Sequence, residues 1–176
     1  MQSSADALPY KIACLCDLRD KDGRVLLLRR LKAPNFGLCS PIGGKLDMHT
    51  GESPAQCAQR EIAEEAGIHV EVEDLHLAGL ISEAGYEQKT HWLIFYYRVM
   101  VPVWVEPQTI REGELAWFKE SEIDALPLPD TDRRIIWPLI REHEKSVDRQ
   151  GRPGFFAVHI DCTGPEMKWT IEQHGR

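Results

Sequence analysis

Apolar residues along the chain gather in short runs and alternating segments that are typical of β-strands. Two such segments, residues 10–18 and 24–31, flank residues 20–23, whose Asp, Lys, Asp and Gly favour a turn. We therefore expect the chain to open with a β-hairpin. Residues 68–72 alternate as in a half-buried strand, and residues 90–101 are rich in aromatic and β-branched side chains. Further strands are predicted over residues 115–118, 155–160 and 168–173.

The strongest helix signal covers residues 54–66. Ser53 and Gln56 have the spacing of a capping box at its start. Pro54 suits the first helical position, and Gly67 supplies a stop at the other end. A short helix is also predicted over residues 121–125, and a longer amphipathic helix within residues 132–149.

The order of these elements, strands mixed with helices, predicts one layered domain. The chain has 176 residues, which suits a single compact domain, and it shows no internal repeat and no linker long enough to separate two domains. We expect residues 1–176 to form one domain of the α/β class, with strands and helices packed around a common core.

Charge and apolar content exclude several kinds of partner. The chain has 21 Lys and Arg against 28 Asp and Glu, for a formal net charge of -7, and no basic run longer than two residues. Long nucleic acid is therefore not an expected partner, because binding it depends on neutralising phosphates. No segment approaches the about 18 apolar residues of a membrane helix, and no signal-peptide pattern opens the chain. We expect a soluble cytoplasmic protein with no membrane partner.

The cysteines agree with a reducing compartment. There are five of them, an odd number, with no C-x-x-C pair. Cys14 and Cys16 lie two residues apart in a predicted strand, so both face the same side and are expected to be core residues. None of these features specifies an oligomeric state.

Three carboxylates crowd one edge of the predicted helix 54–66. Glu61, Glu64 and Glu65 cover an arc next to its apolar stripe. Like charges at this spacing repel one another, so the cluster indicates a compensating cation. A hard divalent ion with oxygen ligands, Mg²⁺ or Mn²⁺, suits it chemically. The alternative is a solvated acidic face paired with Arg60 and lysines.

The surrounding sequence contains a recognisable motif. The chain reads GKLDMHTGE from Gly44 and REIAEEAGI from Arg60, with seven residues between the two segments. This resembles the Nudix box of the Nudix hydrolases, G-x5-E-x7-R-E-U-x-E-E-x-G-U, in which U is a bulky aliphatic residue. Every fixed position from Glu52 to Ile68 matches, but seven residues separate Gly44 from Glu52 where the pattern has five. We place the two extra residues in the loop before the helix, since loops absorb insertions at low cost.

The resemblance implies a fold and a reaction. The Nudix fold is an α/β/α sandwich around a mixed sheet, and the reaction is metal-dependent hydrolysis of a nucleoside diphosphate linked to another group. By the same resemblance, Glu61, Glu64 and Glu65 bind one or more Mg²⁺ ions, or Mn²⁺, and the carbonyl of Gly43 adds a ligand.

Other residues of the motif have supporting roles by resemblance. Arg60 orients the carboxylates through hydrogen bonds to Glu52 or Glu64, so Glu52 supports the ligands without binding the metal. A carboxylate near the metal can deprotonate or position the attacking water. Glu64 is the preferred general base and Glu61 the second choice, because the family does not use one position uniformly.

Two further sets of residues are candidates for the site. Many Nudix hydrolases add an acidic ligand from a loop before a late strand, which makes Glu112 the preferred extra ligand and Glu114 the second choice. An ordinary polar turn is the alternative. Lys45, directly after the glycine pair, can contact a phosphate as a point charge. Arg29 and Arg30 can do the same or stay solvated.

More loosely, the chain resembles hydrolases of oxidised purine nucleoside triphosphates. The shared features include Trp117-Phe118 in a strand, a downstream acidic turn and a carboxy-terminal hairpin. An acidic pair in that turn reads the purine edge in this group, which points here to Asp130 and Asp132, although both could instead be helix N-caps. Ser40 stands where the group often has Asn. The predicted reaction converts a normal or oxidised purine nucleoside triphosphate to monophosphate and pyrophosphate.

Other substrate classes stay open. Dinucleoside polyphosphate hydrolases of the family carry a Tyr 16 to 18 residues after the box, and Tyr86 stands 18 residues after Ile68. ADP-ribose hydrolases typically have a Pro in this region, whereas none occurs here between Ile68 and Val101. A non-catalytic Nudix module that binds nucleotide is the remaining alternative. Such modules usually lose a box carboxylate, and this chain retains them all.

Overall fold

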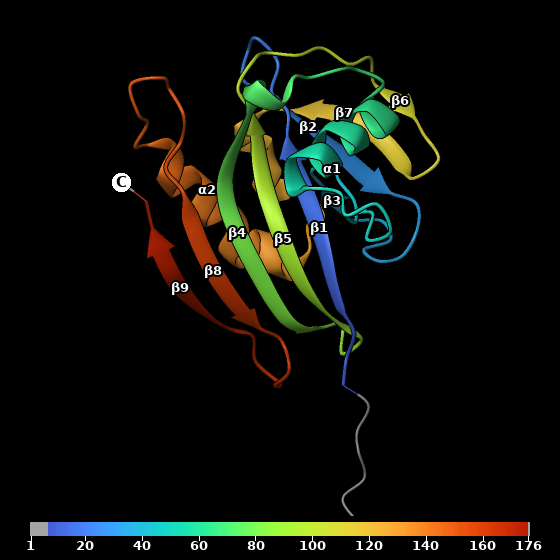
Figure 1. Ribbon diagram of the computed structural model, residues 1–176, viewed down its shortest axis with the longest axis vertical. Coiled ribbons are helices and arrows are strands. Elements are labelled where there is room, and N and C mark those ends of the chain that lie inside the picture. The colour runs from blue at the N-terminus through green and yellow to red at the C-terminus, as the bar shows by residue number, and fades with distance from the viewer. Residues whose placement is uncertain (1–6, 176) are drawn as a thin grey trace, which may run out of the picture.

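The larger of two β-sheets is mixed and forms the centre of the molecule (Figure 1). The computed structural model describes residues 7–175, so residues 1–6 and 176 of the predicted domain lie outside the described part. Within the larger sheet β1 pairs with β5 and β4 with β8 in parallel, whereas β4 and β5, and β8 and β9, pair antiparallel. In spatial order its strands are β1 (Tyr10–Asp17), β5 (Thr90–Val99), β4 (Leu75–Tyr86), β8 (Phe156–Asp161) and β9 (Lys168–His174).

The smaller sheet is antiparallel. It lies at the upper right of Figure 1, behind α1. Its strands, in spatial order, are β3 (Cys39–Ser40), β2 (Val25–Arg30), β7 (Gly113–Phe118) and β6 (Gln108–Thr109).

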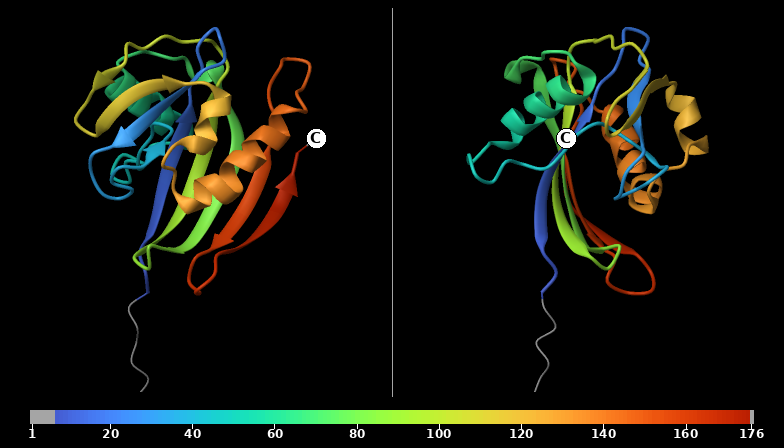
Figure 2. Two further views of the ribbon diagram at one scale, coloured as in Figure 1. Left: turned by 180° about the vertical axis from the view of Figure 1, so that it is seen from behind. Right: turned by 90° about the vertical axis from the view of Figure 1, so that its right-hand side faces the viewer.

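The two main helices cover opposite faces of the larger sheet, as Figure 2 shows. This is the expected α/β/α sandwich. α1 (Pro54–Glu61) continues into a π-helical turn, Ile62–Ala66, and a second π-helical turn, Asp132–Ile136, leads into α2 (Trp137–Glu144). Short 3₁₀ turns form at Val72–Asp74 and Glu120–Ala125. Over residues 7–175, every helix is too short or too polar to cross a membrane.

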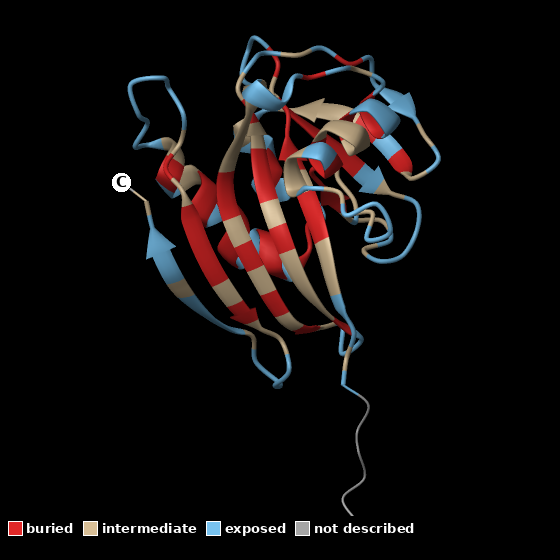
Figure 3. Ribbon diagram, viewed as in Figure 1, coloured by how far each residue is buried: buried red, intermediate tan, exposed pale blue. Residues whose placement is uncertain are grey.

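Each face of the larger sheet carries its own hydrophobic core. Ala58 and Ile62 pack on the α1 side together with Cys14 and Cys16, and all four are fully buried. The core role predicted for the two cysteines is therefore confirmed. Trp137 and other apolar residues of α2 form the core on the opposite face. Buried positions concentrate on the central strands, whereas β9 is largely exposed (Figure 3).

The predicted opening β-hairpin is wrong. The turn itself is present, with the Gly23 N–H donating to Asp20 O at 3.0 Å, but β1 and β2 enter different sheets, and an isolated bridge joins Arg19, beyond the end of β1, to Val25 of β2. The reason is burial. Val25 and Leu27 of β2 pack in the core on the α2 side, and the residues between and after them pack in the core on the α1 side. β2 therefore contributes to both cores, and its two edges pair with β3 and β7 instead of β1.

The strand predicted over residues 68–72 is also wrong. Val70 is buried on the α1 side, but Gln59 Nε2 donates to its carbonyl oxygen at 2.7 Å, so this segment is pinned to α1 as irregular backbone. The strand begins only at Leu75. Its polar and glycine positions, such as His76 and Gly79, weaken the β-signal in the sequence.

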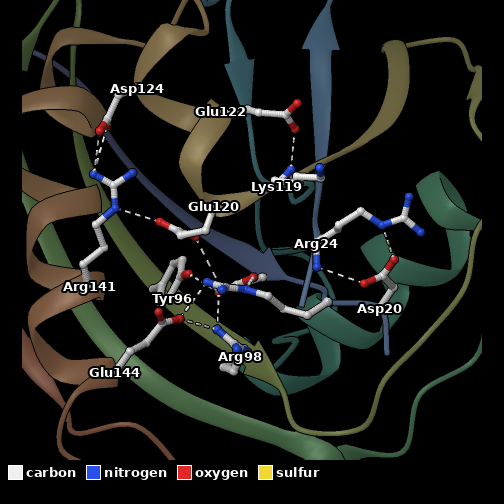
Figure 4. A network of polar contacts seen from close by, with 12 residues as sticks. Asp20, Arg24, Tyr96, Arg98, Lys119, Glu120, Glu122, Asp124, Arg141 and Glu144 are labelled. Carbon is white, nitrogen blue, oxygen red and sulfur yellow. Dashed lines mark hydrogen bonds and ion pairs between the residues drawn. The ribbon is translucent and has the colours of Figure 1, made fainter. Parts of the chain in front are cut away.

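A buried network of charges ties α2 to the larger sheet. Asp17 is fully buried and accepts hydrogen bonds from Tyr96 Oη at 2.8 Å and Arg98 Nη1 at 2.7 Å. Burial alone would raise the pKa of Asp17, but Arg98 and Arg19 outweigh it and hold this pKa below its usual value. Both arginines also contact Glu144 of α2, at 2.6 and 2.7 Å. Figure 4 shows this contact and the neighbouring bridge from Arg141 to Glu120 and Asp124.

Candidate active site

The helix that carries the candidate carboxylates is fixed at both ends. Ser53 Oγ accepts from the Gln56 N–H at 3.2 Å and Gln56 Oε1 accepts from the Ser53 N–H at 2.9 Å, so the predicted capping box is present. Gly67 ends the helical stretch, and its N–H donates to Ala63 O at 3.1 Å. π-helical turns such as Ile62–Ala66 are rare and are often found at functional sites.

The glycine loop, residues 42–45, lies along the open edge of β1. The Cys16 N–H donates to Ile42 O at 2.8 Å and the Cys14 N–H donates to Gly44 O at 2.9 Å. Gly43 has φ 153°, and a Cβ there would lie 2.1 Å from Cys14 O. The loop therefore follows the edge strand more closely than any residue with a side chain permits.

Two carboxylates of the helical stretch turn inward onto this loop. Glu65 is 6% exposed, and its Oε2 accepts from the Gly43 N–H at 3.1 Å. Glu61 lies against Gly44, where a Cβ would come within 2.2 Å of Glu61 Oε1. Glu64 points outward instead, with 59% of its side chain exposed.

Arg60 joins the acidic side chains. Its Nε and Nη2 donate to the two oxygens of Glu52 at 2.7 and 2.9 Å, which is the bidentate pair that a guanidinium makes best. Its Nη1 donates to Glu61 at 2.7 Å and reaches Glu64 at 3.4 Å. The hydrogen bond with Arg60 is the main cause that lowers the pKa of Glu52 to about 2.

The inserted residues lie in the turn between Lys45 and Glu52. Glu52 Oε2 accepts from the Asp47 N–H at 2.8 Å, and the Glu52 N–H donates to Asp47 O at 3.2 Å. The turn is thus closed onto Glu52, and His49, Thr50 and Gly51 are exposed. The longer loop therefore leaves the contacts of Glu52 with Arg60 in place.

The inward carboxylates lie in an environment that penalises their charge. Burial raises the pKa of Glu65 to about 7, and the negative charges of Glu61 and Glu112 raise it further. Burial likewise raises the pKa of Glu61. Glu112 precedes β7, and its carboxyl is close enough to act on Glu65 through its charge. Glu114, the second choice, lies on β7 and is exposed.

This arrangement fits a divalent cation. Two desolvated carboxylates repel each other beside a loop of backbone groups, and a cation with oxygen ligands would relieve that repulsion. Between residues 7 and 175, no three Asp, Glu, His or Cys side chains are close enough to form a complete metal cage. An ion here would therefore take its remaining ligands from water and substrate, as Mg²⁺ commonly does.

A cavity of about 210 Å³, the inner cavity, opens beside the glycine loop. Gly43, Gly44 and Lys45 line it next to the carboxylates, and Arg30 at the end of β2 also reaches it. Three residues that the sequence connects with the choice of substrate also line this cavity, namely Ser40, Tyr86 and Asp132.

Asp130 is not part of the inner cavity. It is exposed and lines a second space of about 650 Å³, the outer cavity, together with Arg134. Tyr86 and Thr131 line both cavities, so the two spaces adjoin at these side chains. The structure thus separates the two acidic residues that the sequence places together, and only Asp132 faces the space beside the glycine loop.

Glu83 was not predicted from the sequence, although it lines the inner cavity and is 4% exposed. Its signal was the period-two pattern of β4, because Glu83 follows the buried Ile81 by two residues and so faces the same side. Asn35 and Trp92 also line this cavity, and Tyr86 donates a hydrogen bond from its hydroxyl to Asn35.

Comparison with known proteins agrees with this geometry. The family model described as NUDIX domain matches residues 9–140. The chain belongs to the NUDIX domain family. It is 28% identical over 127 residues to an 8-oxo-dGTP diphosphatase of Haemophilus influenzae, covering 71% of this chain and 88% of that protein. It is 30% identical over 157 residues to an RNA pyrophosphohydrolase of Sphingopyxis alaskensis, covering 78% of this chain and 94% of that protein.

The Nudix fold is also seen in solved structures. A MutT protein from Bacillus halodurans superposes with a TM-score of 0.69 at 23% identity, over 92% of this chain and 97% of that protein. The chain is therefore a Nudix hydrolase, an α/β enzyme of a family that uses divalent metal cations to cleave nucleotide diphosphate linkages.

Proposed function

We propose that this Nudix hydrolase cleaves a purine nucleoside triphosphate, normal or oxidised, to the monophosphate and pyrophosphate, with Mg²⁺ as cofactor and Mn²⁺ as a substitute. One observation carries the proposal. The inner cavity runs from the glycine loop, where Gly43 and Gly44 contact Glu65 and Glu61, to a second group of buried polar side chains, which includes Asp132. The likeness to the Haemophilus influenzae 8-oxo-dGTP diphosphatase supports the same substrate class.

In this proposal the metal ligands are Glu61, Glu64, Glu65, the Gly43 carbonyl and Glu112. These residues would hold the ion, which would supply positive charge beside the phosphates and lower the pKa of a nearby water. The inward position of Glu65 and the effect of Glu112 on its pKa support these two as part of one group. Arg60 positions Glu61 directly and holds Glu52 as its counter-charge.

Glu64 is the proposed general base. Its side chain is the most exposed of the three helix carboxylates, and its one contact with Arg60 is long, at 3.4 Å. Glu61, by contrast, is held at 2.7 Å by Arg60 and lies against the glycine loop. Glu64 thus keeps a carboxylate oxygen free of close protein contacts that can accept the proton of water, which favours it over Glu61.

Side chains around the inner cavity are assigned to the phosphates and the nucleobase of the substrate. Lys45 and Arg30 are the cations that line it, and we assign them to the phosphates. Ser40 and Asp132 are 7% exposed each and face the same space, which suits contacts with the nucleobase. Asp130 receives only a minor role at the rim of the outer cavity.

A panel of nucleotides tests this function. Purified protein with Mg²⁺ is incubated with dGTP, 8-oxo-dGTP, dATP, dCTP and ADP-ribose, and the products are identified by chromatography. We expect pyrophosphate and monophosphate from a purine triphosphate, and no turnover in excess EDTA. Release of single phosphates, or a preference for ADP-ribose, would contradict the proposal.

A substrate extended beyond the triphosphate is the second candidate. The outer cavity adjoins the inner one at Tyr86 and Thr131, so a second nucleotide has space there. The RNA pyrophosphohydrolase of Sphingopyxis alaskensis, 30% identical to this chain, is a relative whose name refers to such a longer substrate. Faster cleavage of a diadenosine polyphosphate than of any mononucleotide would favour this candidate.

A further inference from the structure

Two carboxyl groups from separate elements meet in the inner cavity, away from the Nudix box. Glu83 comes from β4, and Asp132 from the π-helical turn before α2. They are 4% and 7% exposed. β5 lies between β1 and β4, so two strand spacings of about 4.8 Å put Glu83 roughly 10 Å from the strand that holds the glycine loop. This pair is therefore separate from the carboxylates of α1.

Neither carboxyl has a cationic partner. Among the ion pairs of residues 7–175, none includes Glu83 or Asp132. Thr131 is the hydrogen-bonding neighbour of both carboxyls: its Oγ1 lies 3.4 Å from Asp132 Oδ1, a long contact, and its hydrogen bond lowers the pKa of Glu83 by less than burial raises it. Buried acidic groups of this kind are costly unless a ligand supplies donors.

The groups around the pair are neutral side chains and two cations that line the same cavity. Burial raises the pKa of Glu83 to about 7, and burial together with the charge of Glu83 raises that of Asp132 to about 7. Tyr86 and Cys162 are the other titratable groups facing the pair, and Arg30 and Lys45 line the same cavity. Burial thus favours a proton on one of the two carboxyls near neutral pH, and a protonated carboxyl can donate where an ionised one only accepts.

The cavity wall next to Glu83 is aromatic. Trp92 lies directly opposite Glu83 in the register of β4 and β5 and lines the same space. Side chains of such a pair face the same side of the sheet. The inner cavity thus combines a flat apolar ring with two carboxyls at its edge, which suits a planar heterocycle whose rim carries hydrogen-bond donors.

We infer that Glu83 and Asp132 together select the nucleobase, and that they select the edge of guanine which carries N1–H, the 2-amino group and O6. This inference rests on the proposed function. The ionised carboxyl accepts from N1–H and the amino group at once, and the protonated carboxyl donates to O6. Adenine and cytosine present one donor group beside an acceptor nitrogen, so they cannot fill both oxygens of the carboxylate in this way.

The Glu83–Asp132 pair does not distinguish an oxidised guanine from a normal one. Guanine and 8-oxoguanine have the same N1–H, 2-amino and O6 edge, so the pair distinguishes guanine from other bases but not oxidised from normal guanine. Any preference for the oxidised form must come from other side chains of the cavity.

The test uses amide substitutions that keep side-chain size. Glu83→Gln, Asp132→Asn and the double variant are compared with wild type for kcat/KM on dGTP, 8-oxo-dGTP, dATP and dCTP. Glu172→Gln is the matched control, because Glu172 is exposed on β9 and lines neither the inner nor the outer cavity. Far-UV circular dichroism and thermal unfolding confirm that each variant is folded.

We expect the double variant to lose at least about tenfold of the wild-type preference for dGTP over dCTP, because the site no longer offers two acceptors to adjacent donors. The two single variants should differ. Replacing the ionised carboxyl by an amide should remove most of that preference, whereas replacing the protonated carboxyl should remove less, because a neutral amide can still donate to O6. The ratio of 8-oxo-dGTP to dGTP should stay within about twofold in every variant. A double variant with the wild-type ranking of nucleobases would overturn the inference.

A binding measurement tests the base selectivity of the pair separately from hydrolysis. Binding of dGMP, dAMP and dCMP is measured by calorimetry in EDTA, where no hydrolysis occurs. Preference for dGMP in wild type, lost in the double variant, supports the pair even if no triphosphate is cleaved. Cleavage of triphosphates without any selectivity at the pair would leave the function standing and refute the inference. Because the pair loses its proton as pH rises above about 7, the dGMP preference should also fall between pH 6.5 and 8.5.

Discussion

Arg60 donates two hydrogen bonds to the Glu52 carboxylate, from Nε at 2.7 Å and from Nη2 at 2.9 Å. Nη1 of the same guanidinium donates to Glu61 Oε1 at 2.7 Å. One side chain thus fixes an acidic residue of the preceding loop and an acidic residue of the helix. Only a planar fork with several N–H groups can do this, because an ammonium is a single point of charge.

Arg60→Lys should therefore lower kcat/KM by at least about tenfold, because Lys cannot hold Glu52 and Glu61 together. The measurement is steady-state hydrolysis of the best nucleotide at saturating Mg²⁺. Arg152→Lys is the control, since Arg152 lies on the surface with 47% of its side chain exposed. Wild-type turnover in Arg60→Lys would show that the fork does not position the carboxylates.

Glu64→Gln should reduce kcat by about 100-fold or more if Glu64 is the general base, since proton transfer of this kind contributes about that much. KM should change little, because the exposed carboxylate makes few contacts in the resting site. Glu71→Gln, at an exposed position outside the helix, is the control. A larger loss of kcat in Glu61→Gln than in Glu64→Gln would reverse the roles assigned to these two residues.

Replacing Glu65 with Gln should stabilise the metal-free protein at high pH but not at low pH. Its folded pKa is raised to about 7, so between its ordinary value and pH 7 the unfolded chain ionises while the folded protein holds the proton. Folding is therefore penalised as pH rises through this window. Without metal, Glu65→Gln should unfold at higher urea than wild type at pH 8, by up to about 3 kcal/mol, and show no such gain at pH 4. Equal midpoints at pH 8 in EDTA would contradict the assignment.

Gly44→Ala should displace the Glu61 carboxylate. A Cβ at this position would lie 2.2 Å from Glu61 Oε1 and 2.4 Å from Glu61 Cδ, which is closer than atoms can approach. We expect kcat/KM to fall by at least about tenfold, because a shift of about 1 Å in a catalytic group can cost more than that. Gly164→Ala is the control, since its nearest neighbour would be 3.8 Å away. Unchanged activity would mean that Glu61 does not act from its observed position.

Asp17→Asn should destabilise the fold without changing the chemistry. Loss of one partner from a buried charge cluster costs about 3 to 5 kcal/mol, because Arg98 and Arg19 would remain buried without their counter-charge. Since the folded pKa of Asp17 is lowered, its stabilising effect is present above its unfolded pKa and is lost as pH falls through the folded value. Urea unfolding measures the change, with the exposed Asp22→Asn as control. A difference below about 1 kcal/mol would contradict it.

Local signals in the sequence were sufficient for the helix of the Nudix box. Ser53, Gln56 and Gly67 act through hydrogen bonds to backbone within a few residues, so their spacing alone predicts the contacts that form. The same holds for the helix stripe that buries Ala58 and Ile62. These features depend on helical geometry and not on the rest of the fold.

Long-range packing decided the features that the sequence did not predict. β2 is apolar on both faces because it contributes to both cores, and a hairpin partner cannot be inferred from such a run. Glu83 meets Asp132 only because the chain brings β4 and the segment before α2 to one cavity, across 49 positions of sequence. Asp130 and Asp132 differ in burial although one residue separates them, and that difference appears only once the helical turn is placed.

The path of the glycine loop along β1 has a consequence for solubility. Edge strands of a sheet expose backbone N–H and C=O groups that can pair with another molecule, and such pairing is a common route to aggregation. Here the N–H groups of Cys14 and Cys16 are occupied by Gly44 and Ile42. The glycine loop of the proposed active site therefore also shields the edge of the sheet, so a variant that detaches it should self-associate as well as lose turnover.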